Sequence, residues 1–600
     1  MRVAGVSRLD ALPALHGGSH RLVPAPHVTA ACRRHMPLPH ASTACRRITA
    51  APSRRFTALP PWRYALSHSP YPPSASEPST EPQAPANVAI DAATLLASLP
   101  ARIADIPARG AARDPEHLAL IEDERCLTYT QLAAATNETA MRLRELGVRG
   151  GDRVMIVAEN CVAQIVLLFA AAQLDAWALL CNARLAPAEL DAIVDHAKPR
   201  VAAFATGTSP DAERHAQRRG ARRASALATD IGAWSFTVDA SASAEPLETA
   251  ADRQCAALIY TTGTTGAPKG VMLSHRNLLF IAAMSSTLRR VGPDDVVYTV
   301  LPVSHVYGLA SVCLGSLYAG ASLRLAPRFA PQAVHHALAE ECISIFQGVP
   351  AMHAKLLDYL HTQRLPWRAP RLRFAYSGGS PLDAALKARV ENLYGVALHN
   401  GYGLTETSPT VAQTLLDAPR ADCSVGPPIP GIAVRVMSSD GMDVANGAVG
   451  ELWVRGPNVM LGYYRDAALT RAAITDDGWL KTGDLGRQDP DGAMHIVGRS
   501  KELIIRSGFN VYPAEVEQVL NAHPDVVQSA VIGRPAADGN EEVIAFVELA
   551  AGARVWPEQL IEWCGTRLAP YKRPAEVKLL HAMPAASTGK ILKHKLRELA

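Results

Sequence analysis

The residues best suited to chemistry in this 600-residue sequence are concentrated in Tyr260–Gly270, which reads Tyr-Thr-Thr-Gly-Thr-Thr-Gly-Ala-Pro-Lys-Gly. Four threonines, three glycines and one lysine follow the apolar run Cys255–Ile259, which predicts a buried strand. Glycines let a backbone approach an anion closely, hydroxyls and amides donate to phosphate oxygens, and Lys269 offsets their charge. A plain surface turn is the alternative. The loop is not a Walker motif, because Pro268 and Gly270 flank the lysine where that motif has Gly and Ser or Thr.

A histidine stands at the end of another predicted strand. His305, within Pro302–Gly308, follows the apolar run Val297–Leu301. Sheets of α/β enzymes bind ligands at such strand ends, which favours a functional histidine over a structural one.

The stretch Asn400–Thr407, Asn-Gly-Tyr-Gly-Leu-Thr-Glu-Thr, offers a different set of groups. Tyr402 can stack on a base, Thr405 can donate to phosphate, and Glu406 is a hard oxygen ligand of the kind that Mg²⁺ takes beside phosphates. The Gly-Gly turn in Phe374–Leu382 leaves flat backbone that can lie against a purine. A tight turn with a surface glutamate is the alternative for Asn400–Thr407.

These segments together resemble the adenylate-forming superfamily, which includes acyl-CoA synthetases, 4-coumarate:CoA ligases, luciferases and the adenylation domains of peptide synthetases. The resemblance covers roughly residues 92–600 and extends to Gly478–Asp484, Ile496–Glu502 and Pro584–Lys590. It implies that the loop at Tyr260–Gly270 grips ATP while a carboxylate attacks the α-phosphate. The implied cofactors are ATP, Mg²⁺ and coenzyme A.

The resemblance also implies a role for each matched residue. His305 orients the substrate carboxylate, and Lys590 bridges it to the α-phosphate, so that the implied catalytic residues are Lys590, His305 and Thr405. The implied cofactor-binding residues are Thr261, Thr262, Gly263, Thr264, Thr265, Lys269, Gly379, Ser380, Asn400, Gly401, Tyr402, Asp484, Arg499, Lys501 and Gly508. Glu406 and Thr265 hold the metal, and Tyr307, Ser311 and Gly378 line the acid pocket.

The segment after Arg499 is implied to be a hinge and part of a thiol tunnel. Lys501 occupies the hinge, about which a C-terminal lid rotates after adenylation, and Gly508 lies in the segment that then lines the tunnel. Some relatives carry lysines where this chain has Ile505 and Ser507. The CoA contacts at this segment are therefore left open.

The expected activity is that of an ATP-dependent carboxylic acid–CoA ligase that forms an acyl-adenylate and then a thioester, and the acid is aromatic or medium- to long-chain. Two alternatives stay open: an acyl-adenylate ligase that loads a carrier protein, and a non-catalytic nucleotide-binding homologue. Val306–Ser311 lacks the aspartate that peptide-synthetase relatives keep for an amino group, which disfavours amino-acid substrates.

The composition limits the classes of partner and the cellular environment that we expect for this protein. The net charge is +4, but residues 1–90 contribute about +7, so the remainder is near −3 and gives no reason to expect nucleic-acid binding. Ten cysteines form no Cys-x-x-Cys pair, which favours a reduced, cytoplasmic environment over a zinc or disulfide framework. The most apolar window, Ile165–Ala172, is too short to span a bilayer. Oligomeric state, a homodimer included, is left open.

The elements that position these residues alternate as in a doubly wound α/β fold. Predicted strands at Arg153–Ala158 and Val201–Phe204 flank helices at Cys161–Ala172 and Pro187–His196, whereas residues 206–250 are expected to form a variable loop region. We expect a large α/β domain with doubly wound sheets and a small β-region at residues 91–498, a hinge at 499–503, and a small mobile α+β lid domain at 504–600.

Residues 1–90 are rich in Arg, Ala and Pro and are expected to be disordered. A misassigned start codon, an organellar transit peptide and a regulatory tail are the alternatives for this segment.

Overall fold

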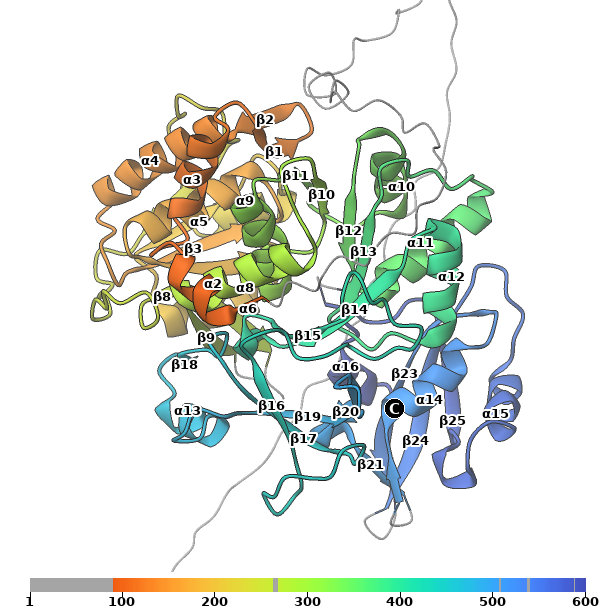
Figure 1. The fold of residues 1–600 in the computed structure, drawn as a ribbon. Helices are drawn as coiled ribbons and strands as arrows, with labels where there is room; N and C mark the ends of the chain where they lie inside the picture. Colours follow the sequence, from red (N-terminus) through yellow and green to blue (C-terminus); the bar gives the residue numbers. More distant parts are fainter. Residues whose placement is uncertain (1–89, 263–267, 507–508, 537–539, 587–588) are drawn as a thin grey trace, which may run out of the picture. The chain divides into compact units, whose positions relative to one another are not determined.

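The computed structural model describes residues 90–262, 268–506, 509–536, 540–586 and 589–600, so residues 1–89 of the predicted tail lie outside the described residues. Two eight-stranded sheets dominate the structure, with strand orders β15-β14-β13-β12-β10-β11-β1-β2 and β18-β9-β8-β4-β3-β5-β7-β6. The inner strands of each sheet are parallel, and antiparallel strands close the edges. This is the predicted α/β class (Figure 1).

The first sheet comprises β1 (Leu118–Glu122), β2 (Arg125–Thr128), β10 (Val296–Thr299), β11 (Ser322–Leu325), β12 (Ile345–Gly348), β13 (Phe374–Gly378), β14 (Leu398–Gly403) and β15 (Thr410–Gln413). The second sheet comprises β3 (Arg153–Ala158), β4 (Trp177–Asn182), β5 (Val201–Phe204), β6 (Arg222–Arg223), β7 (Ser235–Val238), β8 (Cys255–Thr262), β9 (Pro268–Ser274) and β18 (Gly462–Tyr463).

The helices of this region are α2 (Ala92–Ser98), α3 (Asp105–Arg113), α4 (Tyr129–Glu145), α5 (Val162–Gln173), α6 (Pro187–Ala197), α7 (Pro210–Arg218), α8 (His275–Leu288), α9 (Gly315–Ala319), α10 (Pro331–Glu340), α11 (Pro350–Gln363), α12 (Ala384–Tyr394) and α13 (Ala467–Ala473). Short helical turns also occur at Tyr307–Leu314 and Thr405–Thr407.

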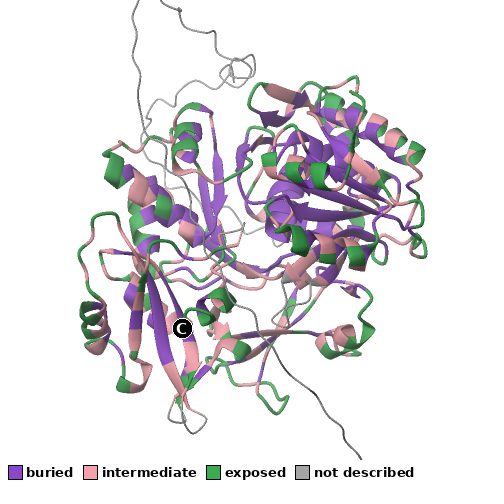
Figure 2. Cartoon of the chain, turned by 180° about the vertical axis from the view of Figure 1, so that it is seen from behind, coloured by how far each residue is buried: buried purple, intermediate pink, exposed green. Residues whose placement is uncertain are grey.

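Helices α5 and α8 form the core between the two sheets. Helix α5 has only Gln164 and Gln173 as polar residues and is buried from Val162 to Ala172, and it packs against β3 and β4 of one sheet and β1 of the other. A helix without a polar face is stable only when protein surrounds it. Figure 2 shows the strands and inner helices buried and the outer helices exposed on one side.

The predicted strands Arg153–Ala158 and Val201–Phe204 are confirmed as β3 and β5. The expectation of a loop region at residues 206–250 is wrong, because this segment contains α7 and the strands β6 and β7. Ser209 caps α7 by accepting a hydrogen bond from the backbone of Ala212. Strand β7 adds to β5 in antiparallel fashion, so the segment completes the edge of the second sheet.

A four-stranded antiparallel sheet, order β16-β17-β19-β20, forms the predicted small β-region. Its strands are β16 (Ala433–Met437), β17 (Gly450–Arg455), β19 (Leu480–Gln488) and β20 (Met494–Arg499). The register of β19 and β20 places Asp484 opposite Arg499, two residues predicted to contact the same cofactor.

The C-terminal part is α+β, as predicted. It contains β21 (Ile504–Arg506), β22 (Phe509–Val511), α14 (Pro513–Asn521), β23 (Val526–Pro535), β24 (Glu541–Leu549), α15 (Pro557–Gly565), β25 (Glu576–Leu580) and α16 (Lys593–Arg597). The sheet β23-β24-β25 packs with α14 and α15 around a core of its own that includes Val516, Val531 and Leu560.

Two histidines in the large domain make its stability depend on pH. Burial lowers the pKa of His275 to about 3 and that of His353 to about 4, below the usual value for an unfolded chain. The unfolded state therefore binds more protons as the pH falls below about 6.5, and each histidine costs about 2 kcal/mol between pH 7 and pH 5.

We expect urea midpoints to fall as the pH is lowered over that range, and His353→Gln to reduce the slope. The exposed His594, replaced in the same way, is the control. An unchanged slope in His353→Gln would contradict the assignment.

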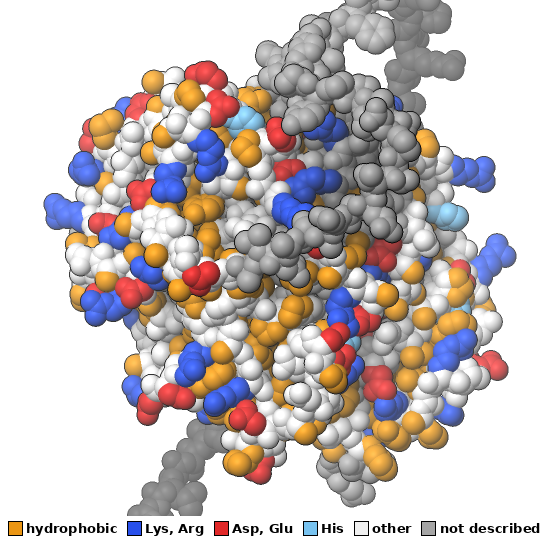
Figure 3. Space-filling model, in the orientation of Figure 1, with side chains coloured by type: hydrophobic (Ala, Val, Ile, Leu, Met, Phe, Trp, Pro, Cys, Tyr) orange, Lys and Arg blue, Asp and Glu red, His pale blue; other side chains and the backbone are white. Residues whose placement is uncertain are grey.

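On the face drawn in Figure 3, Lys and Arg side chains are interspersed with Asp and Glu. Among the described residues, no helix combines the length and apolar character needed to cross a bilayer.

Candidate active site

The predicted phosphate loop connects two antiparallel strands, β8 and β9, and the register pairs Thr261 with Lys269. The Nζ atom of Lys269 lies 5.8 Å from the ring centroid of Tyr463, and the Tyr463 hydroxyl donates a hydrogen bond of 2.8 Å to Oε1 of Glu406. Tyr463 therefore joins the lysine of the loop to the predicted metal ligand. Gly263, Thr264 and Thr265 lie outside the described residues, as does Gly508, and Thr262 is the last residue of β8.

Two predicted base-binding turns follow the neighbouring parallel strands β13 and β14. Gly378 ends β13, Gly379 has a φ of 79°, and Ser380 is half-buried beside it. Gly401 in β14 has no room for a side chain, because an added Cβ would lie 1.8 Å from the Tyr376 hydroxyl oxygen. Glycine is required there by close packing.

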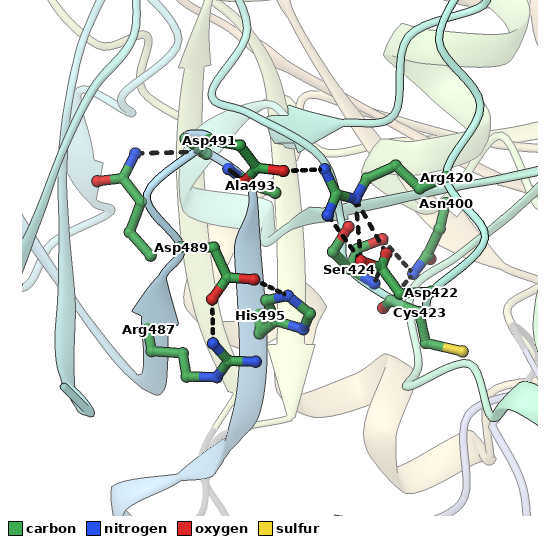
Figure 4. A network of polar contacts seen from close by, with 12 residues as sticks. Asn400, Arg420, Asp422, Cys423, Ser424, Arg487, Asp489, Asp491, Ala493 and His495 are labelled. Carbon is green, nitrogen blue, oxygen red and sulfur yellow. Dashed lines mark hydrogen bonds and ion pairs between the residues drawn. The ribbon is translucent and has the colours of Figure 1, made fainter. Parts of the chain in front are cut away.

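The side chain of Asn400 is used within the protein (Figure 4). Its Nδ2 donates to the carbonyl oxygens of Cys423 and Ser424 at 3.1 and 3.2 Å, and its Oδ1 accepts from the backbone of Gly401 at 3.0 Å. These hydrogen bonds hold the turn, and the contact of Asn400 with a cofactor stays a prediction.

A salt-bridge network connects the loop around Cys423, which the Asn400 side chain contacts, to the β19–β20 hairpin (Figure 4). Arg420 contacts Asp422 with two nitrogens and reaches Asp491 at 2.6 Å. Hydrogen bonds from Arg420 hold the pKa of Asp422 well below its usual range. The network ties the turn that contains Tyr402 to the hairpin that contains Asp484.

Asp484 lies at the centre of the site. It is 3 % exposed, and its Oδ2 accepts a hydrogen bond of 2.6 Å from Tyr402 while its Oδ1 lies 2.9 Å from Nε of Arg499. The Asp484 carboxylate raises the pKa of Arg499, and burial followed by Asp484 raises that of Tyr402 far above its usual value. Three predicted cofactor-binding residues therefore meet at one carboxylate.

The pKa values of Lys590 and His305 are affected by charged residues of the same site. Desolvation by the surrounding protein and then the charge of Arg499 lower the pKa of Lys590, and the carboxylates of Asp484 and Glu502 oppose this shift. Burial and then the charge of Lys590 lower the pKa of His305 to about 4, so His305 is neutral near pH 7. Its Nδ1 accepts from the backbone of Tyr307 at 3.3 Å, which leaves the proton on Nε2, where it can be donated to a carboxylate.

A half-buried lysine pairs with two glutamates near the hinge region. Lys593 lies 3.1 Å from Glu502, beside the exposed Lys501, and 2.9 Å from Glu517 on α14. Arg506 donates to the carbonyl oxygen of Arg573 at 2.7 Å. The guanidinium of Arg506, which stands between the two positions where some relatives are expected to carry lysines, is therefore engaged within the C-terminal part.

The predicted acid-pocket residues lie together. An added Cβ at Gly378 would be 3.4 Å from the Tyr307 ring, and Ser311 contacts the Thr410 hydroxyl at 3.2 Å. Tyr307 is 7 % exposed, and its hydroxyl is buried without a hydrogen-bond partner in the described structure. Thr405 is also buried, next to Glu406 in a short helical turn.

The residues present fit a magnesium ion shared with phosphates. The described residues contain no cluster of three or more His, Cys, Asp or Glu that could hold a metal alone. Oε2 of Glu406 accepts no hydrogen bond from the described residues, whereas Oε1 accepts one from Tyr463. Mg²⁺ is commonly bound by one or two carboxylates plus substrate phosphates, which matches one available carboxylate oxygen near Lys269.

Two family models match the chain. The AMP-binding enzyme model matches residues 108–464, and the AMP-binding enzyme C-terminal domain model matches residues 515–590. The chain belongs to the AMP-binding enzymes. The prediction of an adenylate-forming enzyme of the acyl-CoA synthetase type is confirmed, as is the class of acid–thiol ligase.

Named relatives of this AMP-binding enzyme are CoA ligases. Indoleacetate–CoA ligase of Aromatoleum aromaticum is 34% identical over 501 residues, which is 82% of this chain and 96% of the relative. ATP-bound MatB from Rhodopseudomonas palustris is 32% identical with a TM-score of 0.70, over 83% of this chain and 98% of MatB. o-Succinylbenzoate CoA synthetase (MenE) from Bacillus subtilis, in complex with its acyl-adenylate intermediate, is 27% identical with a TM-score of 0.69, over 82% and 98% of the two chains.

Sequence reasoning missed two residues of this AMP-binding enzyme that the structure places beside the predicted set. Tyr463 lies in the run Gly462–Tyr464, Gly-Tyr-Tyr, whose composition indicates at most a short β-segment. Arg289, at the end of α8, is 1 % exposed and lies next to Tyr376. A charged residue after an apolar helix usually marks only the return to solvent, so its burial could not be read from the sequence.

Proposed function

We propose that this enzyme activates a carboxylic acid, aromatic or medium- to long-chain, with ATP and transfers the acyl group to coenzyme A. The carrying observation is that Asp484, Arg499, Lys590 and His305 lie in one electrostatic environment, although they come from distant parts of the sequence. A carboxylate is already ionised near pH 7 and needs no general base. It needs positioning and charge stabilisation at phosphorus, which these residues can supply.

In the proposed first step, Nε2 of neutral His305 donates to the substrate carboxylate and the cationic Lys590 offsets charge between carboxylate and α-phosphate. Asp484 accepts the ribose hydroxyls, exchanging its hydrogen bond from Tyr402 for those of the nucleotide. Glu406 would hold Mg²⁺, which when bound would neutralise negative charge at the phosphates. Attack on the α-phosphate forms the acyl-adenylate and releases pyrophosphate.

In the proposed second step, the C-terminal lid at residues 504–600 rotates about the hinge at 499–503 and withdraws Lys590. The CoA thiol then attacks the acyl-adenylate and releases AMP. The contacts of CoA with the segment around Arg506 stay open. The predicted cytoplasmic location and the oligomeric state also remain predictions.

The test measures pyrophosphate release with ATP and Mg²⁺, with and without CoA, across aromatic, medium-chain, long-chain and dicarboxylic acids. A CoA-dependent thioester product supports the proposal. Adenylate formation without transfer to CoA would instead favour a carrier protein as the acceptor. Tight ATP binding with no turnover on any acid would favour a non-catalytic nucleotide-binding homologue.

A further inference from the structure

A buried cation without a counter-charge lies beside the residues of the predicted acid pocket. Arg289 is 1 % exposed, and its Nη1 and Nη2 donate to the amide oxygens of Gln347 and Gln413 at 2.9 and 3.0 Å. No carboxylate of the described residues lies within 4.0 Å of this guanidinium, and its Nε is buried without a hydrogen-bond partner. Neutral amide oxygens satisfy hydrogen bonds but supply no negative charge.

Arg289 is connected to each of the predicted acid-pocket residues. Its Cζ lies 4.4 Å from the ring centroid of Tyr376, and that ring meets the Tyr307 ring at a centroid separation of 6.1 Å. An added Cβ at Gly378 would contact both rings, at 3.2 and 3.4 Å. Ser285, one helical turn before Arg289, donates to Ser311 at 3.4 Å.

A second buried polar group near Arg289 also has no hydrogen-bond partner in the described structure. The Tyr307 hydroxyl is buried without a hydrogen-bond partner, and Arg289 is close enough for its positive charge to favour the ionised form of that tyrosine, against the larger effect of burial. Burying a charge and a hydroxyl without compensation is costly, so sites that do so in an apo protein commonly gain their partners from a ligand.

We propose that Arg289 and Tyr307 bind a second anionic group of the acid substrate, so that the natural substrate is a dicarboxylic or sulfo-carboxylic acid. His305 and Lys590 take the reacting carboxylate, and the distal carboxylate or sulfonate sits against Arg289 at the other end of the pocket. A negative charge there compensates the buried guanidinium, whereas an apolar tail leaves it uncompensated. This inference rests on the proposed function and specifies its substrate class.

The test compares matched acids that differ only in the distal anion: hexanoic with hexanedioic acid, octanoic with octanedioic acid, and phenylacetic acid with its para-carboxy and para-sulfo derivatives. Pyrophosphate release gives kcat/KM for each. We expect the wild-type enzyme to prefer the doubly anionic member of at least one pair by about tenfold or more. Arg289→Gln should lower that ratio on the order of 100-fold, as expected when one member of a buried charge pair is removed.

Arg290→Gln is the matched control, because this neighbouring arginine is exposed and pairs with Asp417 at the surface. It should leave the ratio unchanged. If Arg289→Gln does not fold, the preference of the wild-type enzyme between the matched acids still tests whether a distal anion is bound. Equal or better turnover of every monocarboxylic partner overturns the inference and leaves the proposed function standing, whereas failure of all acids of both kinds overturns both.

Discussion

Replacing Lys590 by alanine should lower adenylation by at least about 1000-fold and leave thioester formation from supplied acyl-adenylate within about threefold of wild type. The reason lies in its surroundings. Lys590 is close enough to His305, Arg499 and Asp484 for their charges to affect one another, and in the proposed first step its ammonium offsets the charge that develops during attack on phosphorus. In the proposed second step the lid has withdrawn it.

Adenylation and transfer to CoA can be measured separately in the Lys590→Ala variant. Exchange of labelled pyrophosphate into ATP reports adenylation, and release of AMP from acyl-adenylate and CoA reports transfer. Lys595→Ala is the control, because Lys595 lies shortly after Lys590 in the sequence, on α16, and is exposed. An equal loss in both half-reactions would show that Lys590 acts in folding or in both steps, and would remove the assignment.

Much of the fold could be predicted because the local signals are strong and agree with the tertiary structure. Strands β3 and β5 are short apolar runs between turn residues, and the structure starts and ends them where the pattern does. The segment at residues 206–250 could not be predicted in this way. Helix α7 is short and polar, and β7 gains its stability from pairing with β5.

The residues of the site could be named from motifs, but their arrangement could not. The contact of Asp484 with Arg499 follows from the register of β19 and β20, and the contact with Tyr402 follows from the packing of two separate sheets. Neither is a local property of the chain. Arg289 is the extreme case, since nothing in its neighbourhood in the sequence distinguishes it from the exposed Arg290.

Replacing Glu406 by glutamine should lower adenylation by on the order of 100- to 1000-fold at fixed Mg²⁺, and raising the Mg²⁺ concentration should recover part of the loss. Glutamine keeps the shape of the side chain and still accepts the hydrogen bond from Tyr463, which is 2.8 Å long in the native protein. The change therefore removes a negative charge with little change in packing, and Mg²⁺ held between Glu406 and the phosphates would lose its carboxylate ligand.

Tyr463→Phe removes the donor of the same hydrogen bond and leaves the Glu406 carboxylate in place. It removes the hydroxyl from Glu406 but keeps the aromatic ring, whose centroid lies 5.8 Å from Nζ of Lys269. Because the carboxylate and the lysine both remain, we expect a loss below about tenfold and a nearly unchanged Mg²⁺ dependence. If the two variants were equally impaired, with the same Mg²⁺ dependence, Glu406 would serve to hold Tyr463 against the phosphate loop, and the metal would have to be held by other groups.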